Sequence, residues 1–193
     1  MPGPSNSRKK KQKPAPPKNM ATTSTLPCLY IPDDSAPDHP VEQRTLVFPP
    51  GATFDDVVCP VLQCPERVAE TIYSEHLSDV YEGRPPTPPE SEFVMYEAYM
   101  DDNGNATRPY NTRAAHMLLR PKSHGPMLVV KVICTRDRGT GADVPVRFAP
   151  LAARELESAE FRAKKARYDG KKAVYEEAVL AQFRREGGIV INL

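Results

Sequence analysis

His124-Gly-Pro-Met-Leu-Val-Val-Lys-Val-Ile-Cys134 is the most apolar run of this sequence, and it decides the fold. Its β-branched residues stand between a Gly-Pro start and a Thr-Arg-Asp-Arg-Gly turn, a pattern typical of a short strand that is buried on both faces. We therefore expect the segment from Met127 to Cys134 to form the central strand of a sheet.

Segments on both sides of this run have the composition of strands and turns. The turn Asp101-Asp-Asn-Gly-Asn105 separates two of them, and Pro145 inside another places that segment at a sheet edge. The predicted strands are 44–48, 93–100, 114–120 and 144–148.

Two short helices are predicted before most of these strands. Thr53 is a suitable N-cap, and Asp55 and Asp56 in the first turn suit the helix dipole, so we expect a helix over 53–63, although Pro60 interrupts it. The apolar stripe in 66–82 predicts a second helix that ends at Gly83.

The sequence thus predicts one α+β domain with a mostly antiparallel sheet of three to five strands, two short helices before it and a long charged C-terminal helix. The expected divisions are a disordered basic and Pro-rich arm (1–40), the core domain (41–149), the long helix (150–187) and a β-prone tail (188–193).

The expected disorder rests on composition. The chain has 193 residues and 22 prolines, of which 11 fall among the first 50 residues. The arm also contains a basic cluster that resembles a nuclear import signal, with a solvated basic tail as an equal alternative. The cluster consists of Arg8, Lys9, Lys10, Lys11 and Lys13.

The net charge of +1 hides a strong segregation of charge. Residues 1–32 carry six basic and no acidic side chains, residues 33–102 carry three and sixteen, and residues 103–193 carry seventeen and nine. Attraction between an acidic and a basic half within one domain is the simpler interpretation. The alternative is that one half presents an acidic face to a basic partner.

Neither a metal centre nor a known catalytic motif is indicated. Cys59 and Cys64 lack a second pair of ligands, so we expect no metal and no cofactor, with the four cysteines as buried apolar side chains. His116 or His124 could form a nucleophilic pair with Cys134 only if the fold brings them together, and an enzyme whose site is assembled from residues far apart in the sequence remains an alternative. No leader-like apolar region or membrane-length apolar run occurs, which favours a cytoplasmic or nuclear protein with no membrane contact.

Arg84-Pro-Pro-Thr-Pro-Pro-Glu-Ser-Glu92 is the sharpest short motif. Thr87-Pro88 suits proline-directed kinases, and Thr87 with Ser91 resembles the phosphorylated motifs that F-box ubiquitin ligases recognise. A stiff polyproline connector between helices and sheet is the favoured alternative.

The long helix has two distinct faces. A seam of small residues runs along one side, and aromatic and lysine side chains lie on the other. That second face either packs on the sheet, which we favour, or binds an acidic protein or nucleic acid. Its residues are Phe161, Lys164, Lys165, Tyr168, Lys171, Lys172 and Tyr175.

Gly187-Gly188 separates a strongly β-prone tail from the helix. The tail resembles the short hydrophobic motif that adds as a strand to SUMO-type modifiers, and pairing with an edge of the chain's own sheet is favoured over pairing with a partner. Its apolar members are Ile189, Val190, Ile191 and Leu193.

Together these features favour a non-enzymatic intracellular protein-interaction module with an unidentified protein partner. A nucleic-acid-binding protein that uses the basic arm and the helix lysines is the first alternative, and an enzyme whose site is scattered in the sequence is the second.

Overall fold

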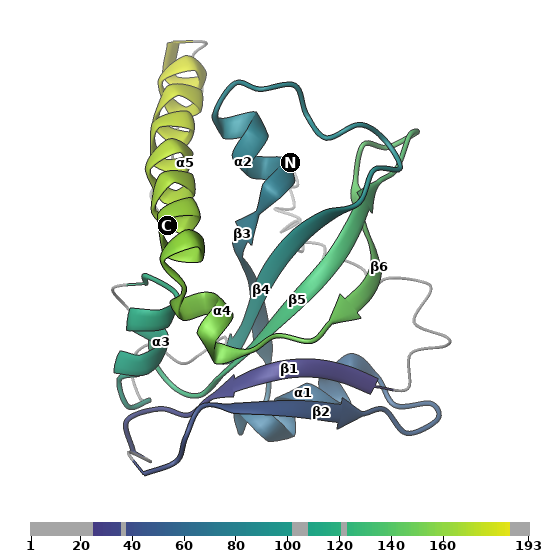
Figure 1. Ribbon diagram of the computed structural model, residues 1–193, viewed down its shortest axis with the longest axis vertical. Helices are drawn as coiled ribbons and strands as arrows, with labels where there is room; N and C mark the ends of the chain where they lie inside the picture. The colour runs from purple at the N-terminus through teal and green to yellow at the C-terminus, as the bar shows by residue number, and fades with distance from the viewer. Residues whose placement is uncertain (1–24, 36–37, 102–107, 121–122, 186–193) are drawn as a thin grey trace, which may run out of the picture.

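The computed structural model describes residues 25–35, 38–101, 108–120 and 123–185 of the chain. These residues form an α+β fold, as the sequence predicts, but the sheet has six strands rather than three to five (Figure 1). The elements are β1 (Thr25–Ile31), β2 (Glu42–Val47), α1 (Phe54–Leu62), β3 (Arg67–Ser74), α2 (Glu75–Tyr81), β4 (Phe93–Asp101), α3 (Thr112–Met117), β5 (Met127–Arg136), β6 (Asp143–Ala149), α4 (Ala153–Glu157) and α5 (Ala159–Arg185).

The sheet is antiparallel throughout and is built around β5, which confirms the predicted central strand. Its order is β2-β1-β5-β4-β3, and β6 also pairs with β5. β4 pairs with β5 along residues 128–134, while β1 pairs with residues 127–129 and β6 with residues 131–136. β5 therefore has a neighbour on both edges for most of its length, because β1 and β6 share one edge.

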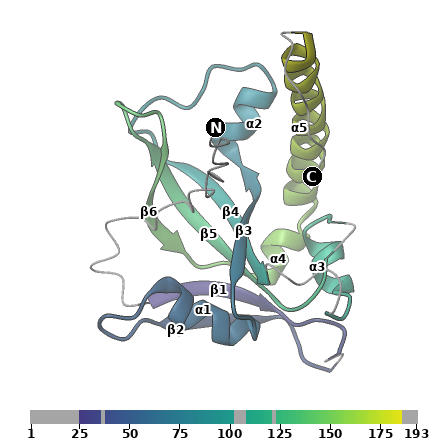
Figure 2. The ribbon, with the colours of Figure 1, turned by 180° about the vertical axis from the view of Figure 1, so that it is seen from behind.

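Two apolar clusters occupy the two faces of the sheet. Ile31, Tyr96 and Val129 belong to the first cluster, with side chains from α3, α4 and α5. Val130 belongs to the second, with Leu62 from α1. Figures 1 and 2 show the two sides of the molecule, with α5 rising beside α2 and α1 lying against β1 and β2 at the lower end.

β1 corrects the prediction that residues 1–40 are disordered. Residues 25–31 form a strand between β2 and β5, and Leu26, Leu29 and Ile31 are fully buried. Proline has no N–H to donate to a neighbouring strand. Pro27 is tolerated in β1 because the pairing of β1 with β5 covers residues 29–31 and does not reach Pro27. The proline-rich composition around this strand concealed a buried segment.

The helix predicted over 66–82 is wrong in its first half. Residues 67–74 form β3 and pair with β4, and only Glu75–Tyr81 is helical. An irregularity between Thr71 and Tyr73 shifts the register, so Ile72 and Tyr73 are both buried and the usual alternation of a strand is lost. β1 and β2 therefore precede α1, and β3 lies between α1 and α2, whereas the sequence predicted that both helices come before most of the strands.

The strand predicted over 114–120 is also wrong, because residues 112–117 form α3. The buried Asn111 caps this helix, accepting a hydrogen bond from the Ala114 N–H at 2.8 Å. Its side-chain amide donates to the carbonyl of Gly125 at 2.7 Å. One asparagine thus fixes the start of α3 and ties it to the chain just before β5.

Other local predictions are confirmed. α1 begins after Thr53, which forms a capping box with Asp56, and Pro60 lies inside the helix. The strand predicted over 93–100 is β4, and that over 44–48 is β2 with a small shift. β6 contains Pro145 and, within the part of the chain that the structure describes, pairs with β5 alone.

The long C-terminal helix is present as two pieces. α4 ends at Glu157. The next residue, Ser158, has an extended backbone, and its side-chain oxygen accepts a hydrogen bond from the Phe161 N–H at 3.1 Å, so Ser158 caps α5. α5 then continues through Gly170 to Arg185. The predicted import signal (8–13), the β-prone tail (188–193) and the rest of residues 1–24 lie outside the described residues.

None of the helices in the described ranges is long and apolar enough to cross a membrane.

Candidate interaction surface

The first half of α5 is fixed to the body by a ladder of aromatic rings. Phe161 lies 5.1 Å from Tyr96 of β4, and Tyr168 lies 5.5 Å from Tyr73 of β3, as distances between ring centroids. Phe161 and Tyr168 are 5% and 2% exposed. The ladder therefore packs on the sheet, and these two aromatic side chains are not open to a partner.

The lysine next to this ladder is also buried. Lys165 is 4% exposed and forms an ion pair with Asp169, one turn further along α5. A buried ammonium needs such a partner, because an unpaired charge away from water is costly. The predicted partner face is therefore corrected for Phe161, Lys165 and Tyr168, which belong to the packed interior.

The remaining lysines of that face stay at the surface. Lys164 pairs with Glu160 at 2.8 Å, and Lys172 lies 3.9 Å from Glu176. The hydrogen bond that Lys164 donates to the carboxylate of Glu160 raises the pKa of Lys164. Pairs of this kind along one helix stabilise the helix only slightly.

Beyond Tyr168 the same face of α5 leaves the body. Tyr175 still contacts Tyr81 of α2, with ring centroids 5.2 Å apart, but it is 44% exposed. Val179 and Phe183 follow at steps of four and are 47% and 48% exposed. In Figure 1 this yellow end of α5 rises above the sheet.

We call Tyr175, Val179, Leu180 and Phe183 the distal patch. Leu180 is 43% exposed and lies beside Val179 on the helix. Residues four apart on a helix are neighbours on its surface, so Tyr175, Val179 and Phe183 form one continuous apolar ridge. A soluble helix normally turns such a ridge towards a core, and here the ridge extends past the core that its first half fills.

The partner face predicted from the sequence included Tyr175 but not Val179, Leu180 or Phe183. The spacing of four residues between positions 175, 179 and 183 could have predicted this ridge. The prediction followed instead the aromatic repeat of seven residues, Phe161, Tyr168 and Tyr175, which ends at Tyr175.

The segment from Arg84 to Glu92 is held against the body at several points. Arg84 forms an ion pair with Asp79 at 2.6 Å, and the Thr87 N–H donates to Nδ1 of His76 at 3.3 Å. The Glu90 N–H donates to the carbonyl of Arg136 at 3.2 Å. These bonds suit the polyproline connector, and a ligase that reads Thr87 in an extended peptide would have to break them. Phosphorylation of Thr87 and Ser91 stays a prediction.

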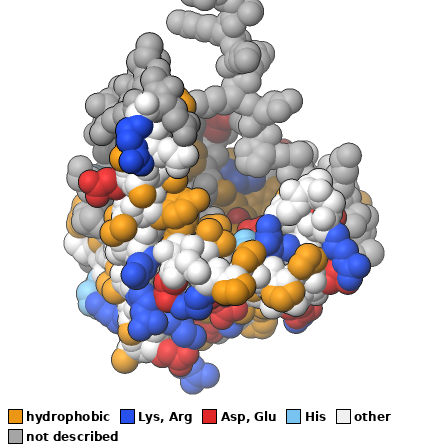
Figure 3. Space-filling view, turned by 90° about the horizontal axis from the view of Figure 1, so that it is seen from above, with side chains coloured by type: hydrophobic (Ala, Val, Ile, Leu, Met, Phe, Trp, Pro, Cys, Tyr) orange, Lys and Arg blue, Asp and Glu red, His pale blue; other side chains and the backbone are white. Residues whose placement is uncertain are grey.

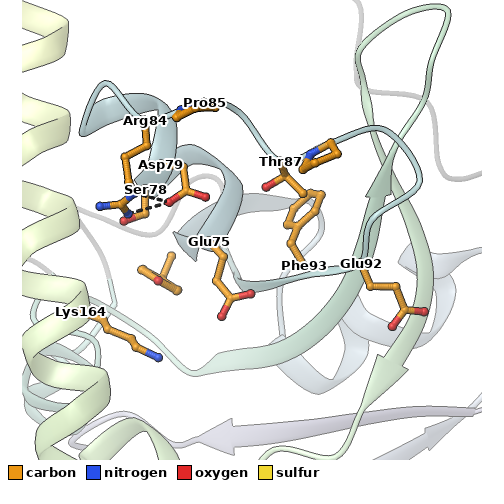
Figure 4. A pocket seen from close by; sticks show the side chains of 11 residues that line it. Glu75, Ser78, Asp79, Arg84, Pro85, Thr87, Glu92, Phe93 and Lys164 are labelled. Carbon is orange, nitrogen blue, oxygen red and sulfur yellow. Dashed lines mark hydrogen bonds and ion pairs between the residues drawn. The ribbon is translucent and has the colours of Figure 1, made fainter.

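A shallow hollow of about 440 Å³ lies between this segment, α2 and α5 (Figure 4). Glu75, Asp79 and Glu92 face it together with Arg84 and Lys164. Each carboxylate already has a partner, since Glu75 accepts from the Val94 N–H, Asp79 binds Arg84 and Glu92 binds Arg147. The hollow is therefore lined by paired charges.

The residues of the enzyme alternative do not meet. His116 lies near Arg162, with 3.4 Å between Nε2 and the guanidinium, while His124 contacts the carbonyl of Arg108 and the ring of Tyr110. Cys134 lies in the apolar cluster that also contains Leu62 of α1, where burial raises the pKa of its thiol to about 12. None of these contacts joins one member of the set to another.

The cysteines behave as small apolar side chains. All four are buried and free, and burial is also the main reason that the pKa of Cys64 rises to about 12, followed by the neighbouring Cys59. A thiol in this state is a poor nucleophile and a poor metal ligand. Within residues 25–35, 38–101, 108–120 and 123–185, no group of three metal-ligating side chains comes together.

Comparison with protein-family models, with curated proteins and with solved structures found no match to this chain.

Proposed function

We propose that this protein is a non-enzymatic protein-interaction module whose contact surface is the distal patch of α5. One observation carries the proposal: the helix face that buries Phe161 and Tyr168 continues as the exposed apolar ridge Tyr175, Val179 and Phe183, of which Tyr175 still contacts Tyr81 of α2. The α+β body then serves to hold this ridge in a fixed direction.

The rest of the surface supports this assignment by contrast. Ion pairs join the acidic segment 33–102 to the basic segment 103–193, as in Arg120 with Glu70 at 2.7 Å and Arg138 with Glu90 at 2.8 Å. Figure 3 shows red and blue side chains interspersed on the upper face of the molecule. Several ion pairs thus join the two oppositely charged segments within the fold, and the apolar ridge is the more distinctive surface feature.

The experiment compares two positions on the same helix. A photoreactive amino acid replaces Val179 in the ridge or Val174, which is 65% exposed and lies on a different side of α5. We expect the full chain in a lysate of its source cells to form a discrete protein adduct from position 179 and none from 174. The adduct should be identified by mass spectrometry and should disappear when excess unlabelled wild-type chain competes for the partner.

Equal labelling from both positions would show that the ridge has no special role. So would an adduct from 179 that persists unchanged in the presence of the unlabelled competitor.

Nucleic-acid binding is the second candidate, favoured by Arg167 and Lys171. Both are exposed and lie one turn apart on α5, and no ion pair to either occurs among the described residues. Binding that depends on such side chains weakens steeply as salt rises, whereas contact through the apolar ridge does not. The location of the protein, cytoplasmic or nuclear, stays a prediction.

A further inference from the structure

We propose that Thr87 is phosphorylated by a proline-directed kinase and that its phosphate releases segment 84–92 from the body of the protein. This inference goes beyond the proposed function, because it concerns a different surface from the distal patch. It rests on the accessibility of Thr87, the weak attachment of the segment and the charges around the hollow that Thr87 lines.

Thr87 is the one residue of the chain that suits such a kinase. Thr87-Pro88 is the only Thr-Pro or Ser-Pro pair in the 193-residue sequence. Residues 84–88 have no regular secondary structure, and Thr87 is half-buried between exposed neighbours. Figure 4 shows its hydroxyl oxygen on the side of the hollow. The acceptor hydroxyl is therefore within reach once the segment opens locally.

The segment is attached to the body by a few bonds near Thr87 and Glu90. The Thr87 N–H donates to Nδ1 of His76 at 3.3 Å, and the Glu90 N–H donates to the carbonyl of Arg136 at 3.2 Å, both long for hydrogen bonds of this kind. The ion pair of Glu90 with Arg138 is exposed, and the φ of Glu90 is +65°, which L-residues disfavour. A modest opposing energy is therefore sufficient to detach the segment.

Phosphorylation adds a large negative charge at this point. Oγ of Thr87 forms a bond to the γ-phosphorus of ATP, the bond from that phosphorus to the β–γ bridging oxygen breaks, and ADP leaves. The hydroxyl proton passes to the catalytic base of the kinase. The product carries a charge of about −1.5 to −2 near pH 7.

The hollow has no free cation for this phosphate. Its two basic side chains are already in ion pairs, Arg84 with Asp79 at 2.6 Å and Lys164 with Glu160 at 2.8 Å. Glu75 accepts from a neutral backbone N–H, and no ion pair to its carboxylate occurs in the part of the chain that the structure describes. A phosphate that stayed in the hollow would lie near this negative charge or compete with Asp79 for Arg84, so the released segment is favoured.

The first test treats the full chain with a purified proline-directed kinase and magnesium ATP. Mass spectrometry should show one phosphate, on Thr87, and Thr87→Ala should take up none. NMR-detected hydrogen exchange should then show the Glu90 amide exchanging roughly tenfold faster or more after phosphorylation, while the amides of β5 keep their rates. The Glu90 amide is the reporter because it lies three residues from the phosphate.

The second test removes the charge that opposes the phosphate. Glu75→Gln keeps an oxygen that accepts the backbone N–H, so the phosphorylated variant should show only a small acceleration at Glu90. Glu157→Gln is the matched control, because Glu157 is exposed on α4 and does not line the hollow. Its phosphorylated form should behave like phosphorylated wild type.

Three outcomes would overturn this inference. A kinase that modifies a synthetic peptide of residues 84–92 but not the full chain would show that the fold withholds Thr87. A phosphorylated chain whose Glu90 amide exchanges at the same rate or more slowly would show that the hollow accommodates the phosphate. Equal release in Glu75→Gln and wild type would rule out repulsion by Glu75 as the cause. None of these results bears on the distal patch, so the proposed function is tested separately.

Discussion

At the scale of single residues, His76 links the proline-rich segment to the core. Its side chain is 5% exposed, its ring centroid lies 5.5 Å from that of Phe93, and its Nδ1 accepts the Thr87 N–H. Burial lowers the pKa of His76, and Arg136 acts in the same direction, while Asp143 and Asp79 oppose it. The folded protein therefore favours the neutral ring that this hydrogen bond requires.

This environment predicts that acid destabilises the protein through His76. In the unfolded chain the histidine binds a proton near its ordinary pKa of about 6.5, whereas the folded chain resists that proton. The free energy of unfolding should be steady above that pH and should fall as the pH drops below it, until the folded-state pKa is passed. Urea unfolding at a series of pH values between about 7 and about 5 measures this slope.

His76→Asn is the matched variant, because an amide oxygen near the position of Nδ1 still accepts a hydrogen bond and does not titrate. The variant should lose most of the slope between about pH 7 and about pH 5. A wild-type slope that the variant reproduces in full would assign the pH dependence to other groups.

At the scale of elements, α5 joins two functions in one helix. Its first half closes the sheet with Phe161 and Tyr168, and its second half carries the distal patch. The rigidity of the connection matters, because the patch has a fixed direction only if the helix is continuous. Gly170, between the two halves, is the weakest point of the helix backbone.

Gly170→Ala should therefore stabilise the protein. Gly170 is in the helix interior and a Cβ atom there would meet nothing within 4 Å, so alanine removes the entropic cost of glycine without a clash. The free energy of unfolding should rise by about 0.5 to 1 kcal/mol, measured by urea denaturation.

Gly83→Ala is the control. Gly83 has equally open space around it but follows α2 with φ at +70°, a conformation that L-residues disfavour. Alanine there should destabilise the fold by about 1 kcal/mol. If both substitutions changed stability in the same direction, backbone conformation would not be the cause.

At the scale of the whole molecule, the sheet is organised so that β5 is the best protected element. β4 pairs along one of its edges, β1 and β6 share the other, and apolar clusters cover both faces. Among the described residues, the edge strands β2, β3 and β6 each pair with a single neighbour. The apolar side chains near the end of α5 are exposed.

Native-state hydrogen exchange should follow this order. We expect the amides of Val129 to Val132 to exchange most slowly, at rates set by global unfolding, and those of residues 179–185 to exchange fastest among the helical residues. Fast exchange in β5 would contradict the assignment of this strand as the centre of the fold.

Elements whose signals are local could be predicted from the amino-acid sequence. The apolar run 127–134 identified the central strand, Thr53 with Asp56 identified the start of α1, and Pro145 identified an edge strand. In each case a run of side chains or a capping residue is sufficient, because the preference acts within a few residues of the chain. The α+β class followed from the same local patterns.

The tertiary structure decided what depends on distant partners. β1 is a strand because β2 and β5 supply its hydrogen bonds. β3 is a strand because β4 supplies its hydrogen bonds, although the apolar residues of β3 have the spacing of a helix. The fold likewise divides one face of α5 into a packed half and an exposed half. That division sets the candidate surface: α2 ends at Tyr81, so Tyr175 makes the last aromatic contact and the ridge beyond it stays open.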